Sequence, residues 1–246
     1  MITKNTVKLI QSLKLQKYRK EHRLFVVEGR KMVEELLKSS FETVYLFATE
    51  RSLSEHVLQD ERLETVTDVQ MEQMSGQDTP PGILAVARIP KMEVKTGERM
   101  VLALDGIANP GNMGTIIRTA EWFGIQQIIC SEDCVELWNP KVIQATMGSV
   151  FRMHVAYTDL EGFLNASKQS GKAIYGALLE GGNLFKMNRW EEGILVIGSE
   201  SHGIRSNILP CITHPITIPR AQGSQAESLN ASMATGIILA AFAMNS

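Results

Sequence analysis

Several features that would assign the chain to a special class of protein are scarce in its sequence. It has three cysteines with no Cys-x-x-Cys spacing, so a disulfide framework or a structural zinc site is not expected. The longest late apolar run, residues 236–244, is far shorter than the roughly 20 residues of a membrane-spanning helix. The formal net charge of -2 gives no general argument for nucleic acid. We expect a reduced, cytoplasmic protein without a targeting segment, a membrane anchor or a metal site.

The chain does contain enough apolar sequence for two hydrophobic cores, because 44% of its 246 residues are hydrophobic. A Pro-Pro-Gly turn, an apolar run and a charged connector follow one another over residues 75–100. This combination is typical of a boundary between domains. We therefore predict two domains, one over residues 1–95 and the other over residues 98–246.

Short apolar runs alternate with helical segments throughout the second predicted domain. The runs VLALDG (101–106), ILVIGSE (194–200) and PITIP (215–219) are examples. Such alternation predicts an α/β fold in which helices cover both faces of a parallel sheet. Ligands of these sheets bind at the carboxyl ends of the strands, so the loops after these three runs are candidates for the site.

The first of these loops leads into the stretch NPGNMGTIIRTAEWFG at residues 109–124. We expect Asn112 to cap a helix over about 113–123 whose apolar stripe faces the core. Arg118 lies off that stripe, which fits either an ordinary surface arginine or a functional guanidinium. The turn is rich in glycine, but the spacing Gly-x-Gly-x-x-Gly of a dinucleotide site is absent.

The other two loops also carry polar side chains directly after apolar strands. In IGSESHGIR (197–205), Glu200 and His202 lie between two glycines, and His202 has no neighbouring ligand that would complete a zinc site. In the loop before the last helix, Ser228 and Asn230 fit either a helix cap or a functional site.

Together, the three segments resemble the three motifs of the SpoU (TrmH-type) branch of the SPOUT RNA methyltransferases. NPGNMGTIIRTA matches the first motif, IGSESHGI the second and IP…ESLNAS the third, in the same order and with similar spacing. One departure is Arg220, which follows the Ile-Pro pair where many relatives have methionine. QKYRKEHRLFVVEGRKMVEE (16–35) resembles the family's appended substrate-binding domain, which is of the ribosomal L30e or L7Ae type.

The resemblance implies a C-terminal parallel-sheet domain with a deep trefoil knot, preceded by a smaller α/β L30e-like domain. It also implies a homodimer that binds S-adenosyl-L-methionine in the knot and transfers its methyl group to a ribose 2′-hydroxyl of RNA. The appended domain favours ribosomal RNA as the substrate, and transfer RNA remains an alternative.

Site residues follow from the same resemblance. The catalytic and substrate-positioning set is Asn112, Arg118, Glu200, Ser228 and Asn230. The cofactor is expected to contact mainly the backbone around Ala177, Leu178, Gly198, Ile218 and Leu229. An arginine stays protonated, so we interpret Arg118 as a phosphate clamp and hydroxyl activator, although the family also suggests a role as base.

The first 30 residues carry eight basic side chains against two acidic ones. Alone, this pattern fits a solvated helix face, but in an RNA methyltransferase it favours RNA contact by Lys17, Arg19, Lys20 and Arg23. Two further classes remain as alternatives. One is a noncatalytic RNA-binding protein, and the other is a nicotinamide-dependent oxidoreductase, for which the glycine spacing is wrong.

Overall fold

A computed structural model describes residues 2–55, 58–95, 97–187 and 190–244. The residues group into two compact units. The first unit contains residues 1–91 and 136–152, and the second contains residues 92–135 and 153–246. The domain boundary near residue 95 stays a prediction, and the grouping adds the segment 136–152 to the first unit.

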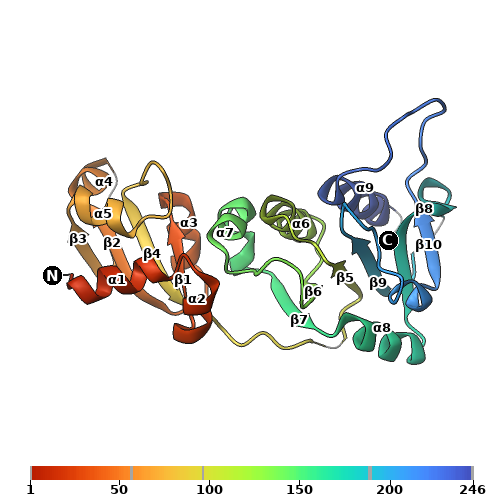
Figure 1. Ribbon diagram of the computed structural model, residues 1–246, viewed down its shortest axis with the longest axis horizontal. Helices are drawn as coiled ribbons and strands as arrows, with labels where there is room; N and C mark the ends of the chain where they lie inside the picture. The colour runs from red at the N-terminus through yellow and green to blue at the C-terminus, as the bar shows by residue number, and fades with distance from the viewer. Residues whose placement is uncertain (1, 56–57, 96, 188–189, 245–246) are drawn as a thin grey trace. The chain divides into compact units, whose positions relative to one another are not determined.

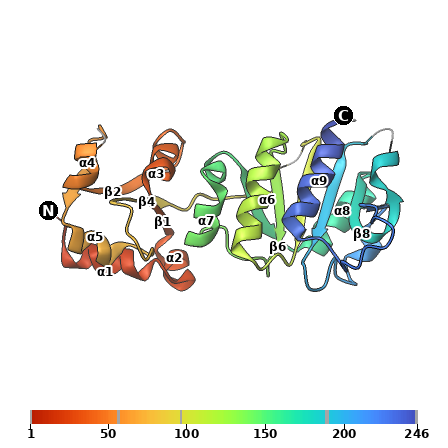
Figure 2. The same cartoon turned by 90° about the horizontal axis from the view of Figure 1, so that it is seen from above.

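The first unit contains a four-stranded sheet in the order β1-β4-β2-β3, in which β2 and β3 are parallel and the other pairs antiparallel. Its strands are β1 (Leu24–Glu28), β2 (Thr43–Thr49), β3 (Leu63–Val66) and β4 (Ile83–Arg88). Its N-terminal helices are α1 (Lys4–Ser12), α2 (Gln16–His22), α3 (Arg30–Leu37), α4 (Glu50–Glu55) and α5 (Asp68–Met74). Helices α1 and α5 cover one face of the sheet, and α3 and α4 the other (Figure 2).

The segment 136–152 completes the core of the first unit. It contains α7 (Pro140–Thr146) and the 3-10 helix η1 (Ser149–Phe151). The buried ring of Trp138 lies 4.5 Å from that of Phe25 and 5.9 Å from that of Phe41, centroid to centroid. Aromatic rings of this size contribute much of the apolar area that a small domain buries. The first unit therefore depends on residues that lie far from it in sequence.

The second unit contains a parallel sheet of six strands in the order β10-β8-β9-β5-β6-β7. The strands are β5 (Met100–Asp105), β6 (Gln127–Ser131), β7 (His154–Thr158), β8 (Ala173–Asn183), β9 (Gly193–Gly198) and β10 (His214–Thr217). Every residue of β5 and β6 is buried, as expected for central strands covered on both faces.

Helices cover both faces of this sheet. They are α6 (Pro110–Trp122), α8 (Leu160–Gln169) and α9 (Ala231–Met244), with the 3-10 helices η2 (Leu184–Lys186) and η3 (Leu209–Cys211). Helices α6 and α9 pack against each other on one face, and α8 covers the other (Figure 1). In the described part of the chain, no helix is long and apolar enough to cross a membrane.

The pairing of β8 with β10 skips several residues of β8. Pro215 pairs with Gly176, whereas the next residue, Ile216, pairs with Gly182. A side chain at Gly181 would come within 2.8 Å of the Pro215 backbone, so the two chains approach closely there. The intervening residues 177–181 form a bulge beside the carboxyl end of β9.

Candidate active site

The turn between β5 and α6 is held by Ser131, the last residue of β6, and by Cys134, which follows that strand. The backbone N–H of Gly106 donates to Ser131 Oγ at 2.9 Å, and that of Ile107 donates to Cys134 Sγ at 3.2 Å. Hydrogen bonds with Cys130, Ser131 and this backbone lower the pKa of the Cys134 thiol to about 7. These contacts fix the direction in which the chain enters α6.

Helix α6 is capped by Asn109, so the prediction that Asn112 is the cap was wrong. The Asn109 side chain accepts from the N–H groups of Gly111 at 2.8 Å and Asn112 at 3.2 Å, and Pro110 occupies the first helical position. The Asn112 side chain, one turn further on, is therefore available to other segments.

The Asn112 side chain links the three motif loops. Its Nδ2 donates to Glu200 Oε1, and its Oδ1 accepts from Asn230 Nδ2 at 3.0 Å. Asn230 also caps α9, because its Oδ1 accepts from the N–H groups of Ser232 and Met233. The capping and the functional interpretations of Asn230 are therefore compatible.

Glu200 lies on a tight hairpin at the end of β9. Ser199 and Gly203 exchange backbone hydrogen bonds of 3.1 and 2.9 Å, and Gly203 has a φ of +64°. A Cβ at Gly198 would lie 2.1 Å from the Gly203 carbonyl carbon, so only glycine fits there. The hairpin presents Glu200 to Asn112.

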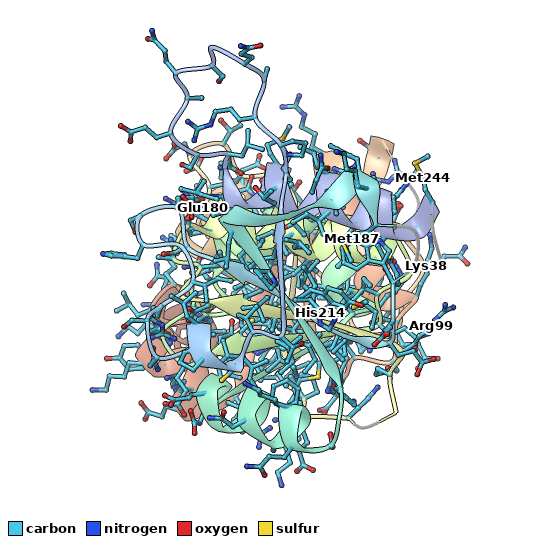
Figure 3. The ribbon with its side chains drawn as sticks, turned by 90° about the vertical axis from the view of Figure 1, so that its right-hand side faces the viewer. Lys38, Arg99, Glu180, Met187, His214 and Met244 are labelled. Atoms are coloured by element: carbon cyan, nitrogen blue, oxygen red, sulfur yellow. The ribbon has the colours of Figure 1, made fainter. Side chains whose placement is uncertain are left out.

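A pocket of about 870 Å³ opens between the bulge of β8 and the carboxyl ends of β9 and β10. Most of its lining comes from residues 177–180, 197–204, 216–221 and 226–229. The loop from β10 to α9, which supplies part of the wall, extends away from the sheet (Figures 1 and 3). Within that loop, Arg220 Nη2 donates to the Glu227 carbonyl at 2.8 Å.

The structure brings most of the predicted site residues together. The pocket lining includes all five residues predicted to contact the cofactor, namely Ala177, Leu178, Gly198, Ile218 and Leu229. Glu200 and Ser228 also line it, and Asn112 and Asn230 join it through Glu200. Arg118 is exposed on α6 outside the lining, and its guanidinium has no hydrogen bond or ion pair to the described residues. The roles of all these residues stay predictions.

The four predicted RNA-binding residues differ in their surroundings. Lys17, Lys20 and Arg23 are exposed, and Arg23 Nη2 donates to the Ile89 carbonyl at 3.1 Å. Arg19 is only 2% exposed and uses its guanidinium inside the first unit, on the Glu136 carboxylate and on two carbonyls of residues 13 and 14. That placement argues against a phosphate contact by Arg19.

Two residues that the motifs did not single out, Asp105 and Arg205, also belong to the surroundings of the pocket. Asp105 ends the apolar strand β5 and is fully buried, and its carboxylate is paired with Arg205. A charge at the end of an otherwise apolar run was the signal in the sequence that could have drawn attention to it. Their partners could be identified only in three dimensions.

The fold and the pocket define an α/β protein with a cavity at the carboxyl ends of parallel strands, which is where such sheets bind their ligands. Residues 99–240 match the family model of the SpoU rRNA methylase family, and residues 4–85 match the MRM3-like substrate binding domain. The chain belongs to the SpoU rRNA methylase family. The predicted family and its methyltransferase class are thereby confirmed.

Individual relatives resemble the chain over its whole length. It is 28% identical to the 23S rRNA (guanosine(2553)-2′-O)-methyltransferase RlmP of Bacillus subtilis, covering 95% of this chain and 94% of the relative. A TrmH-family structure from Porphyromonas gingivalis is 33% identical, with a TM-score of 0.90 and full coverage of both chains. An AdoMet-bound rRNA methyltransferase from Sinorhizobium meliloti is 26% identical, with a TM-score of 0.84 over 98% of this chain and 95% of that one. The predicted SPOUT α/β knot fold is thereby confirmed.

The pocket suits S-adenosyl-L-methionine. Its volume lies in the range of sites for small cofactors, and its wall at the hairpin is bare backbone because Gly198 and Gly203 carry no side chains. Apolar side chains of Leu178, Ile197 and Ile216 suit the nucleoside part, and the carboxylates that line the pocket suit a cationic sulfonium. The residues present therefore fit the cofactor of this family.

Replacing Asn112 by aspartate is expected to lower kcat/KM for methyl transfer at least tenfold, or about 1.4 kcal/mol of transition-state stabilisation. Aspartate has the same shape, but it replaces the donor to Glu200 by a second carboxylate. Steady-state kinetics of the purified variant measure the effect. Asn109→Asp is the matched control, because aspartate caps helices as well as asparagine does and activity should persist. Equal activity of the two variants would leave Asn112 with no role in the site.

Proposed function

We propose that the protein transfers the methyl group of S-adenosyl-L-methionine to a ribose 2′-hydroxyl of ribosomal RNA. The observation that carries this proposal is the Glu200–Asn112–Asn230 hydrogen-bonded chain, which joins three motif loops beside one pocket. Since methyl transfer from sulfur to oxygen is an in-line displacement, the enzyme must above all hold donor and acceptor in register. Loops that are hydrogen-bonded to one another can hold the donor and the acceptor in a fixed geometry.

Each group in the site has a distinct part in this reaction. S-adenosyl-L-methionine bound in the pocket would supply an electrophilic methyl group, with the neutral thioether as the leaving group. Backbone around Gly198, Ile218 and Leu229, which line the pocket, would hold the cofactor. Arg118 donates to the phosphate beside the target ribose and to the attacking oxygen, which stabilises negative charge there while the hydroxyl proton passes to water. Glu200 positions the ribose.

Ribosomal RNA is the substrate that the relatives favour. RlmP of Bacillus subtilis is named for 23S rRNA, and human rRNA methyltransferase 3 is 27% identical over 58% of this chain and 37% of its own length. The match of residues 4–85 to a substrate binding domain supports a structured RNA that contacts the first unit. A cytoplasmic location is part of this proposal, and the similarity to the bacterial RlmP over 95% of this chain supports it.

We also propose that the protein acts as a homodimer. Trp122 on α6 and Met233 on α9 are 84% and 61% exposed, and these two helices pack against each other on one face of the sheet. Exposed large apolar side chains on adjacent helices are typical of a surface that a second chain covers.

A methylation assay with radiolabelled S-adenosyl-L-methionine tests the proposed function. Ribosomal and transfer RNA from a strain that lacks the gene serve as substrates, and nucleoside mass spectrometry identifies the product. We expect a 2′-O-methylated nucleoside from ribosomal RNA only, and sedimentation equilibrium should give the mass of two chains. Label in transfer RNA alone would favour the alternative substrate. Cofactor or RNA binding without transfer would favour a noncatalytic RNA-binding protein.

Replacing Lys17, Lys20 and Arg23 together by glutamine is expected to flatten the salt dependence of RNA binding. Each phosphate contact contributes about 0.7–0.9 to the slope of log K against log salt, so three contacts predict a loss of roughly two units or more. Filter binding at several salt concentrations measures the slope, and affinity for the cofactor should not change. Equal slopes for the wild type and the variant would mean that these three side chains contact solvent and not RNA.

A further inference from the structure

Asp105, at the carboxyl end of β5, is a buried carboxylate with one main partner. It is 0% exposed, and its Oδ2 accepts from the backbone N–H of Arg205 at 2.8 Å. Its Oδ1 accepts from Arg205 Nε at 2.6 Å and lies 2.5 Å from Nη2. The carboxylate therefore binds both the side chain and the main chain of the same residue, which fixes the position of that residue closely.

Arg205 stands where the Glu200 hairpin returns to the sheet. It follows Gly203 by two residues, and the intervening Ile204 is buried and lines the pocket. The Arg205 carbonyl accepts from the N–H groups of Ile208 at 2.9 Å and Leu209 at 3.1 Å, so the same residue also starts the next turn. Leu209 lines the pocket as well. Both pocket-lining segments are thus anchored at Arg205.

We propose that Asp105 and Arg205 are positioning residues that hold the hairpin 199–203 and the adjoining wall in the shape that binds the cofactor. This inference rests on the proposed function. The hairpin is fixed at one end by β9 and at the other by Arg205. Release of the second end frees Glu200 and the bare backbone at Gly198 to move, so the cofactor must order them when it binds.

A second carboxylate provides a matched control. Asp133 Oδ2 lies 3.3 Å from Arg205 Nη1, but Asp133 is more than half exposed and does not bind the Arg205 main chain. An exposed pair of this kind contributes little, whereas a buried carboxylate that loses its cation is strongly disfavoured. Asp133→Asn therefore removes only a weak partner of Arg205, and it is the control for variants of the Asp105–Arg205 pair.

The test compares the full-length wild type with Arg205→Gln, Asp105→Asn/Arg205→Gln and Asp133→Asn. Isothermal titration with S-adenosylhomocysteine in the absence of RNA measures affinity, and circular dichroism measures thermal stability. Arg205→Gln should lower both, because it leaves the Asp105 charge buried without its cation. The double variant should regain stability, because the charge is gone, while its Kd stays at least tenfold above that of the wild type. Asp133→Asn should stay within twofold of the wild type.

The double variant separates positioning from folding. If it regains affinity together with stability, the pair serves only the stability of the fold and the inference is overturned. Affinity within twofold of the wild type in Arg205→Gln would overturn it as well. A wild type that binds neither S-adenosylhomocysteine nor S-adenosyl-L-methionine would contradict the proposed function itself, a result distinct from any difference between variants.

Discussion

Replacing Arg118 by alanine is expected to reduce methyl transfer by roughly a thousandfold, or about 4 kcal/mol, while the affinity for S-adenosyl-L-methionine stays within a few-fold. The reason is the position of this side chain. It is exposed, lies outside the pocket lining and has no ion pair with the described residues, so its guanidinium is available to an RNA phosphate. Loss of a donor that acts on the reacting oxygen lowers kcat more than it changes cofactor binding.

Single-turnover kinetics with saturating cofactor and RNA measure this effect, with isothermal titration for cofactor affinity. Arg118→Lys is the informative companion. It keeps the charge but loses the planar fork, so a phosphate clamp predicts partial activity. An alanine variant that turns over at nearly the wild-type rate would exclude Arg118 from the reaction. A variant that loses cofactor affinity in proportion to its rate would assign Arg118 to the cofactor instead.

The second large effect concerns folding. Trp138→Ala should lower the free energy of unfolding of the first unit by about 3–5 kcal/mol, as expected for removal of a buried aromatic ring. Trp138 contacts both Phe25 and Phe41, so its removal opens a cavity between residues that cannot easily close it. Urea denaturation followed by circular dichroism measures the change.

Val69→Ala, in which an exposed apolar side chain of α5 is shortened, is the control and should change stability by less than about 0.5 kcal/mol. Comparable losses in the two variants would show that the aromatic cluster contributes nothing beyond its surroundings. An unchanged Trp138→Ala transition would mean that the Trp138 ring contributes little to the stability of the first unit.

The outcome for α6 shows how far local sequence can specify a site. Helix, strand and loop order in residues 101–246 follow from hydrophobic periodicity, because burial on both faces of a parallel sheet leaves a strong pattern. Which of two asparagines caps the helix does not follow, since Asn109 and Asn112 have the same side chain and differ only in backbone position. The motif located the loop of the site, but it did not indicate which asparagine caps the helix.

Long-range contacts explain the other features of the structure that the sequence did not predict. A basic run predicts a charged surface, but Arg19 is buried because Glu136, 117 residues further on, pairs with it. Nothing near Arg19 in the sequence indicates that partner. The same holds for residues 136–152, whose helical pattern fits the alternation of the second domain although their aromatic side chains pack in the first unit. Sequence separation conceals such pairs because periodicity reports only which face is buried.

The bulge of β8 has a consequence for how this pocket can vary among relatives. In the strand pairings of the described sheet, residues 177–181 have no partner in β9 or β10, so their peptide groups lie outside the backbone ladder, and the Leu179 carbonyl accepts instead from Thr217 Oγ1 at 3.0 Å. Every residue except proline offers the same backbone N–H and C=O groups, so a segment that binds its ligand through them can accept amino-acid substitutions without losing the ligand. Relatives with low sequence identity can thus keep the same ligand recognition. A search for invariant side chains would overlook the part of the pocket wall formed by this segment.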